Sequence, residues 1–218
     1  MKIEKKNAQR NRAHILEAAA NIIREEGLQA LKISRLAERS RLTRWTIYNH
    51  FGSLNGVKKE LYNRHDYLVA NLPKIVSLST KQTGPIEFEL LAHIITQHFD
   101  VLMKDPLYRE LAVAEFTGTD RAITQVVSAR EQRMSKMMKA AESVDSTSKP
   151  LSLEFLFPII LGGITYMAFQ YRIGGYSSCF GVTCLQKEFK INLQRFLSHL
   201  IKAAITNFDE DVDDQLMA

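Results

Sequence analysis

The side chains best suited to chemistry lie in one short stretch, residues 43 to 51, which reads TRWTIYNHF. Thr43 has the hydroxyl group preferred at a helix N-cap, so we expect a helix to begin directly after it. The first turn of that helix would present Arg44, Trp45 and Thr46 on one side. Of these, Arg44 is the best candidate to read base edges, because a guanidinium donates two parallel hydrogen bonds to a planar pair of acceptors. These residue types predict non-covalent binding, with no covalent bond made or broken.

Two further segments are expected to hold this helix in place. Residues 33 to 37, ISRLA, have helical apolar spacing, and a break at residues 40 to 42 separates them from Thr43. Residues 12 to 27 form an earlier amphipathic segment that closes on Gly27, a residue suited to the left-handed position after a helix. This order is typical of a helix-turn-helix, whose second helix enters a major groove. The pattern predicts a protein that acts on DNA.

Residues 12 to 62 resemble the N-terminal DNA-binding domain of the TetR family of bacterial transcriptional regulators. The matching motifs, all in family order and spacing, are Ile15-Leu16-x-Ala18-Ala19, Glu26-Gly27, Leu36-Ala37 and Ile47-Tyr48-x-His50-Phe51-Gly52-Ser53. The resemblance covers about the first 60 residues. Together with the residue types, it gives the expected DNA-contacting set: Lys32, Ser34, Thr43, Arg44, Trp45, Thr46, Tyr48, Asn49, His50 and Lys58. Within that set, Trp45 packs either on DNA or against its own helix.

The chain departs from the family pattern at three positions. Arg41 stands where the family usually has glycine in the turn, so a residue with a Cβ has to adopt a turn conformation of moderate cost. Lys32 replaces the usual threonine cap of the second helix and cannot accept its backbone hydrogen bonds, a role open to Ser34. Leu54 replaces a lysine that commonly binds phosphate, and Lys58 or Lys59 is the expected substitute.

Charge is unevenly distributed along the 218 residues. Residues 1 to 65 hold 14 Lys/Arg and 6 Asp/Glu, a balance of +8, whereas residues 66 to 218 hold 15 and 18, a balance of −3. This asymmetry favours a basic module that meets a polyanion, joined to an acidic module that does not. A plain solvated basic surface remains the alternative that charge alone would allow.

Beyond residue 62 the pattern is a run of helices with few strand signals, so the predicted fold class is all-α. We expect an N-terminal three-helix helix-turn-helix domain followed by a helical effector-binding and dimerisation domain. The predicted boundaries are 1–53 for the DNA-binding domain, 54–72 for a connecting helix and 73–218 for the ligand-binding and dimerisation domain. Later helices are predicted over residues 85–104, 106–116, 120–143, 151–173 and 185–208.

Residues 155 to 169, FLFPIILGGITYMAF, form the most apolar stretch of the chain. It is shorter than the roughly 20 apolar residues that a membrane span requires, so no membrane partner is expected. A helix apolar on all sides is better buried against a partner helix. With residues 191 to 201 it is predicted to build a homodimer interface that includes Ile164 and Phe196, the alternative being an intramolecular core.

An effector pocket is expected between the later helices, lined by apolar groups with a few polar anchors. The candidate ligand-binding residues are His98, Phe99, Glu115, Phe116, Arg130, Met134, Phe155, Tyr166 and Gln170. No cofactor is predicted. No metal site is predicted either, because His93 and His98 are five residues apart and do not share a helix face, and the only two cysteines lack the further ligands of a zinc site.

No nucleophile elbow, phosphate-cradling glycine loop or His-Glu-x-x-His pattern occurs in the sequence, so catalysis is not expected. The polar, basic start of the chain is unlike a signal peptide and favours a cytoplasmic location. The predicted function is that of a dimeric, sequence-specific transcriptional regulator, a repressor released from a double-stranded DNA operator by a small molecule. The alternative is a regulator of the same kind with no ligand, a repressor or activator controlled by its abundance.

Overall fold

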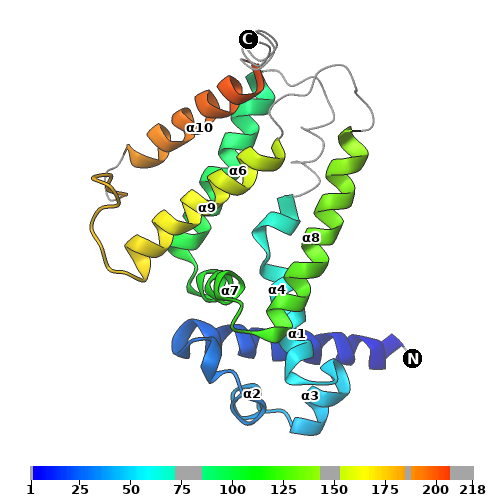
Figure 1. Ribbon diagram of the computed structural model, residues 1–218. Coiled ribbons are helices and arrows are strands. Elements are labelled where there is room, and N and C mark those ends of the chain that lie inside the picture. The colour runs from blue at the N-terminus through cyan, green and yellow to red at the C-terminus, as the bar shows by residue number, and fades with distance from the viewer. Residues whose placement is uncertain (1, 72–84, 143–152, 185–187, 207–218) are drawn as a thin grey trace. The chain divides into compact units, whose positions relative to one another are not determined.

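The computed structural model describes residues 2–71, 85–142, 153–184 and 188–206. The predicted all-α class is confirmed, because the regular elements of these residues are helices (Figure 1). The chain divides into two compact units, Met1–Asp66 with Asp105–Gln132, and Tyr67–Lys104 with Arg133–Ala218.

The first unit begins with helix α1 (Lys2–Glu26), the short 3-10 helix η1 (Leu28–Ala30) and helices α2 (Ile33–Ser40) and α3 (Arg44–Phe51). In Figure 1, α1 runs across the two shorter helices. α1 starts ten residues before the predicted Arg12, because the polar residues that precede Arg12 include good helix formers such as Lys, Glu and Gln. It ends at Glu26, and the next residue, Gly27, has a φ of 83°, which glycine readily adopts.

The turn between α2 and α3 is tight and left-handed. Arg41 has φ 54° and ψ 29°, and its backbone N–H donates to the carbonyls of Ala37 and Glu38. This confirms that a residue with a Cβ occupies the left-handed turn position. The next residues, Leu42 and Thr43, lead directly into α3, so the turn fixes the direction in which the second helix leaves the first.

Three more segments complete the first unit: α4 (Leu54–His65), α7 (Pro106–Thr117) and the first part of α8 (Arg121–Glu142). α1 packs against α2, α3, α4 and α7. One apolar core joins these helices, and its fully buried members include Ile15, Ile22, Ile23, Leu36, Ile47, Leu61, Leu107, Leu111 and Ile123. Helices α1 to α4 therefore share their core with helices that follow residue 104.

The helix predicted over residues 54 to 72 is interrupted. α4 ends at His65, Asp66 has extended backbone angles, and residues 67–71 are helical again, while residue 72 lies outside the described part of the chain. The buried carboxylate of Asp66 accepts a hydrogen bond from Arg130, a residue 64 positions away in sequence. This long-range ion pair holds the interruption in place, and no local signal such as glycine or proline marks it.

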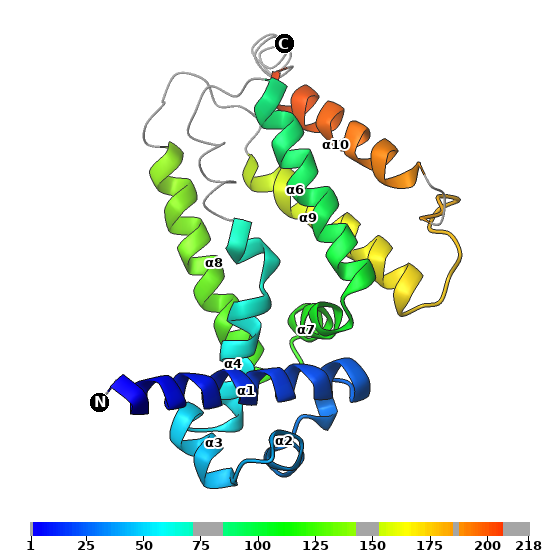
Figure 2. The same cartoon turned by 180° about the vertical axis from the view of Figure 1, so that it is seen from behind.

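The second unit contains α6 (Pro85–Lys104), α9 (Leu153–Arg172) and α10 (Phe189–Thr206). α6 packs against both α9 and α10, as the reverse view in Figure 2 shows. Ile164 of α9 is 4% exposed and therefore belongs to the core of this unit. The prediction that Ile164 lies in a dimer interface is wrong for this reason, whereas Phe196 of α10 is 62% exposed. None of the helices in the described ranges is long and apolar enough to cross a membrane.

Candidate nucleic-acid interface

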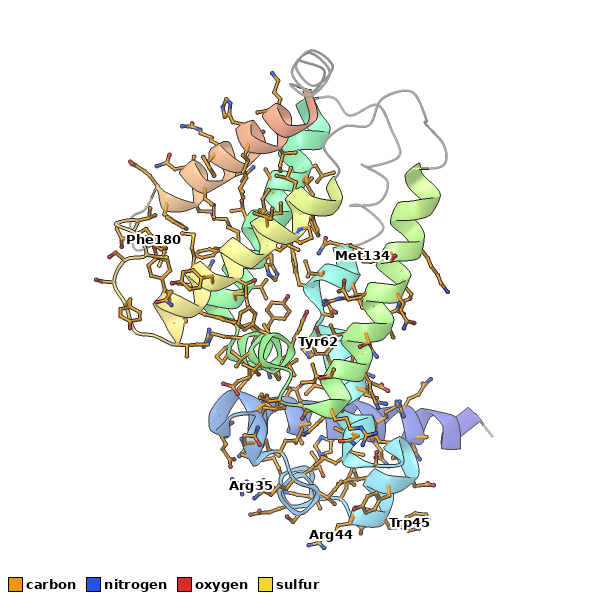
Figure 3. The ribbon with its side chains drawn as sticks, viewed as in Figure 1. Arg35, Arg44, Trp45, Tyr62, Met134 and Phe180 are labelled. Carbon is orange, nitrogen blue, oxygen red and sulfur yellow. The ribbon has the colours of Figure 1, made fainter. Side chains whose placement is uncertain are left out.

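Helix α3 has one buried side and one open side. Ile47 is fully buried in the core and is the one buried residue of the helix. Arg44 and Asn49 are exposed, Trp45 is 73% exposed and Tyr48 is 46% exposed. In Figure 3, Arg44 and Trp45 extend away from the other helices of the first unit. The open side thus combines one cation, an amide and two aromatic rings, which together suit base edges, phosphates and sugars.

The start of α3 is fixed by the predicted cap. The hydroxyl oxygen of Thr43 accepts a hydrogen bond from the backbone N–H of Thr46 at 3.1 Å, so the N-cap role is confirmed. The two threonine hydroxyl oxygens lie 2.9 Å apart and hydrogen-bond to each other. The Thr46 side chain is thereby oriented toward Thr43. Arg44 and Trp45 project from the first turn of α3, whose backbone is held by the Thr43 cap.

Helix α2 carries the other predicted contacts near its start. Lys32 is its N-cap residue, is exposed and makes no side-chain cap, as its chemistry predicts. Ser34 is also exposed, and it does not supply the missing cap. Arg35 is engaged by Glu26 at 2.7 Å and by Glu38 at 3.0 Å. The hydrogen bond from Arg35 holds the pKa of Glu26 below its usual value. Arg39 of α2 likewise pairs with Glu25, whereas Lys32 is exposed just before the helix, so its contact with phosphate stays a prediction.

Lys58 is predicted to bind phosphate, but its side chain is paired within the protein. Its side chain is only 16% exposed and forms an ion pair with Asp120. Asp120 also caps α8, accepting from the backbone N–H groups of Ala122 at 2.9 Å and Ile123 at 3.2 Å. Burial raises the pKa of Asp120, but the hydrogen bonds from Lys58 and the backbone together lower this pKa by more, so it lies below its ordinary value. Contact with DNA would break this pair, so we leave Lys58 out of the interface proposed below.

At the far end of α3, His50 is half-buried and its ring contacts the ring of Phe51, with centroids 6.4 Å apart. The backbone carbonyl of His50 accepts a hydrogen bond from Arg12 of α1 at 2.6 Å. The contacts of Arg12 could not be predicted from sequence, because its partners lie 38 and 48 residues away.

Three of the candidate ligand residues belong to the first unit. Arg130 is 6% exposed and lies among acidic and phenolic groups: it donates to Asp66 at 3.1 Å, to the hydroxyl of Tyr62 at 3.1 Å and to Glu115. Glu115 in turn accepts from the hydroxyl of Tyr62. Burial together with the charge of Glu115 raises the pKa of Tyr62, so this phenol stays protonated. Phe116, on the same helix as Glu115, is 73% exposed.

The other candidates belong to the second unit, where they differ in their contacts and in their exposure. Phe99 packs on Phe189, with ring centroids 5.2 Å apart, whereas the buried His98 lies 3.5 Å from the hydroxyl of Thr165 and contacts the ring of Tyr67. Tyr166 is exposed, and Gln170 and Met134 are half-buried. Phe155 lies in α9, but its side chain is outside the described residues. Among the described candidates of this unit, His98 and Phe99 are buried and Tyr166 is exposed, and a shared ligand site stays a prediction.

The structure also shows a row of residues that the sequence analysis did not connect. Lys58, Tyr62 and Asp66 are spaced four apart along α4 and its end, and each bonds to a residue of α7, α8 or the loop between them. We call these three residues the latch face of α4. The spacing of four residues indicates that the three side chains share one helix face. Their partners lie 53 to 64 residues away and could not be assigned from sequence.

Comparisons with known proteins agree with this geometry. Residues 15–64 match the family model described as bacterial regulatory proteins, tetR family. No curated protein matches the chain in sequence. Among solved structures, the chain is similar in fold to the transcriptional regulator FadR from Bacillus subtilis in complex with stearoyl-CoA, with a TM-score of 0.57 and 15% identity over 90% of this chain and 98% of that one.

Two further structures show the same helical fold. The fatty acid degradation regulator FadR from Bacillus halodurans has a TM-score of 0.55 and 17% identity, covering 90% of this chain and 95% of its own. A linker-substituted mutant of HlyIIR has a TM-score of 0.51 and 15% identity, covering 92% and 99% respectively. These identities establish a shared fold alone. The segment that matches the tetR family of bacterial regulatory proteins is residues 15–64, which hold the helix-turn-helix.

Proposed function

We propose that this regulator binds a two-fold symmetric operator as a homodimer and represses transcription until a small molecule releases it. The observation that carries the DNA-binding part is the open side of α3. A helix anchored by the buried Ile47 and capped by Thr43 leaves Arg44, Trp45 and Tyr48 exposed. Exposed aromatic groups of this size have no role in the core of their own unit, and they suit contact with sugars, phosphates and base methyl groups.

The charge distribution supports the same proposal. The first 65 residues carry a balance of +8, and the exposed cations include Lys32, Arg41 and Arg44 near the turn. Each phosphate neutralised by such a cation releases a counterion, so affinity for any duplex should fall steeply with salt. Arg44 differs from the others because it projects from the first turn of α3, where side chains meet base edges.

The homodimer is supported by an uncovered stripe on α9. Ile159 is 70% exposed and Tyr166 is 47% exposed, and between them Gly162 and Gly163 are exposed with no atom within 4 Å of a Cβ built on either. Positions 159, 162, 163 and 166 share one helix face. A second copy of this helix could approach the glycines closely, and Phe196 of α10 adds further exposed apolar area.

Release by a ligand would follow from differential binding to two states of the protein. The two DNA-binding domains of a dimer can bind together only when the distance between them matches the distance between half-sites. A ligand that binds better to a state in which these distances differ lowers operator affinity, and the operator must weaken ligand binding by the same factor. A tenfold effect requires only about 1.4 kcal/mol of coupling. Because one related fold was solved with stearoyl-CoA, a long-chain acyl-CoA is the first probe to test.

One observation favours the second candidate, a regulator of the same kind without a ligand. Arg130 and Glu115, two of the polar anchors expected in an effector pocket, are bonded to each other and to neighbours within the first unit. Unchanged operator affinity across acyl-CoA and broad metabolite screens would support abundance control over ligand release.

The test of DNA recognition compares wild type with Arg44→Ala and Tyr48→Phe on two duplexes, the sequence that wild type enriches from a random pool and a scrambled control. Arg44→Ala should cost roughly 1–3 kcal/mol on the enriched duplex and much less on the control, because it removes base contacts. Tyr48→Phe should weaken both duplexes alike, because it removes a backbone contact. Equal losses for Arg44→Ala on both duplexes would remove Arg44 from the base-reading role.

A further inference from the structure

We propose that Arg12 of α1 is a positioning residue that sets the orientation of α3 against DNA. This inference rests on the proposed function, because orientation matters only if the open side of α3 reads a duplex. Arg12 does not belong to that open side. It would act through the last turn of the helix, which it connects to α1 and α4.

Three contacts of one guanidinium define this role. Nη1 of Arg12 donates to the backbone carbonyl of His50 at 2.6 Å. Nε donates to a carboxylate oxygen of Glu60 at 3.0 Å, and Nη2 pairs with the other oxygen of the same group. The guanidinium carbon lies 4.5 Å from the centroid of the Phe51 ring. The last two residues of α3 are therefore bound to the first helix and to α4 through a single side chain.

Few apolar contacts hold α3. The helix has eight residues; Ile47 is its one buried residue, and the partly buried Phe51 packs against the same core. Two apolar contacts four residues apart lie on one face of the helix, so polar contacts at its ends help to set its rotation and tilt. Thr43 holds the first turn through its cap, and Arg12 holds the opposite end. These two fixed ends, with Ile47 between them, define the direction in which Arg44 projects.

The chemistry of the contact suits a helix C-terminus. The last four carbonyls of a helix lack partners within it, and the C-terminal end carries partial negative charge. A planar guanidinium can satisfy a carbonyl, a carboxylate and a ring face together, which a lysine ammonium cannot. Because the side chains of Arg12 and Glu60 are 38% and 24% exposed, this ion pair should add little to stability. Its loss should therefore disturb readout more than folding.

Arg64 provides a matched control. It carries the same charge and bonds to the same carboxylate, Glu60, at 3.0 Å, but its recorded contact lies within α4 and does not reach α3. Replacing either arginine with alanine removes one positive charge and a pairing with Glu60, made through two bonds by Arg12 and through one by Arg64. Only the Arg12 substitution also frees the end of α3.

The first experiment measures the affinities of Arg12→Ala, Arg12→Lys and Arg64→Ala for the enriched duplex and for its scrambled control at one salt concentration. We expect Arg12→Ala to lower the ratio of the two affinities by about tenfold, while Arg64→Ala lowers both affinities by the same factor. Arg12→Lys should retain the melting temperature of wild type without restoring the ratio. Equal ratios in the two alanine variants would overturn the proposal.

The second experiment needs no DNA and so separates this inference from the proposed function. Trp45 is the only tryptophan of the chain and lies on α3, so time-resolved fluorescence anisotropy of the full-length protein reports the local motion of that helix. We expect greater Trp45 motion in Arg12→Ala than in wild type and no change in Arg64→Ala. Identical anisotropy decays in all three folded proteins would contradict the positioning role, even if wild type binds its operator as proposed.

Discussion

Two neighbouring helices of the first unit use their polar side chains in opposite ways. The open side of α3 leaves Arg44, Trp45 and Tyr48 exposed, whereas the latch face of α4 places Lys58, Tyr62 and Asp66 against partners from later in the chain. Each polar group of the latch face is paired inside the protein, whereas the side chains on the open side of α3 are exposed. Similar residue types are therefore paired in one helix and exposed in the other, according to burial.

This difference has an energetic side. A buried charge is costly unless it is paired, so the latch face is sensitive to the loss of any one partner. Exposed side chains can be replaced with small changes in folding stability, generally within 0.5 kcal/mol or so. Substitutions on the latch face should therefore unfold the first unit, and substitutions on the open side of α3 should change DNA binding in a protein that remains folded.

The largest effect is expected for Arg130→Ala. The substitution leaves Asp66 and Glu115 without the cation that bonds to both, and Asp66 is buried. Breaking one partner of a buried pair costs roughly 3–5 kcal/mol. Urea denaturation of the variant beside Arg133→Ala, an exposed arginine on the same helix, measures this loss. A difference below about 1 kcal/mol between the two variants would mean that the latch face does not hold α4.

The next largest effect is expected for Gly56→Ala in the first turn of α4. A Cβ built on Gly56 would lie 2.0 Å from the backbone carbonyl oxygen of Phe51, so the end of α3 and the start of α4 would have to separate. Overpacking of this kind costs about 1–3 kcal/mol. Thermal denaturation should show the loss, while Asn55→Ala, an exposed neighbour in the same turn, should be nearly neutral. An unchanged melting temperature for Gly56→Ala would contradict the close approach.

A smaller effect is expected for Thr43→Ala, which removes the cap of α3. Loss of a threonine N-cap costs typically about 1 kcal/mol. Thr43→Ser retains the oxygen that accepts from Thr46, so it should keep most of the stability. Because the cap also fixes the turn that carries Arg44, the alanine variant should lose operator affinity as well. If the serine and alanine variants unfold at the same denaturant concentration, the cap is not what holds α3.

The smallest effect is expected from mild acid. The folded-state pKa of Asp120 lies below its ordinary value of 3.8 because hydrogen bonds from Lys58 and the backbone outweigh its burial. A lowered carboxyl pKa contributes stability at pH values above 3.8, and the contribution disappears as pH falls through the lower, folded value. Lys58→Met should flatten the fall of unfolding free energy below about pH 4. An acid profile as steep as that of wild type would show that Lys58 does not stabilise the carboxylate.

The helix-turn-helix could be predicted from sequence because its determinants are local. Thr43 caps the residues directly after it, Ile47 anchors the same helix, and Arg41 takes the left-handed position that the family pattern assigns to glycine. The placement of Lys58 could not be predicted, because its partner Asp120 is 62 residues away. The burial of Ile164 was missed because an apolar helix gives no local signal that separates a core from an interface.

We propose that Arg44, which projects from the open side of α3, reads bases in a two-fold symmetric site. The most direct test is to select bound sequences from a random DNA pool with wild type and, separately, with Arg44→Ala. We predict that wild type enriches a palindrome with half-sites about one helical turn apart or slightly more. Arg44→Ala should enrich the same palindrome with preference lost at one symmetry-related pair of positions. Identical sequence profiles for the two proteins, or no symmetric sequence from wild type, would contradict the claim.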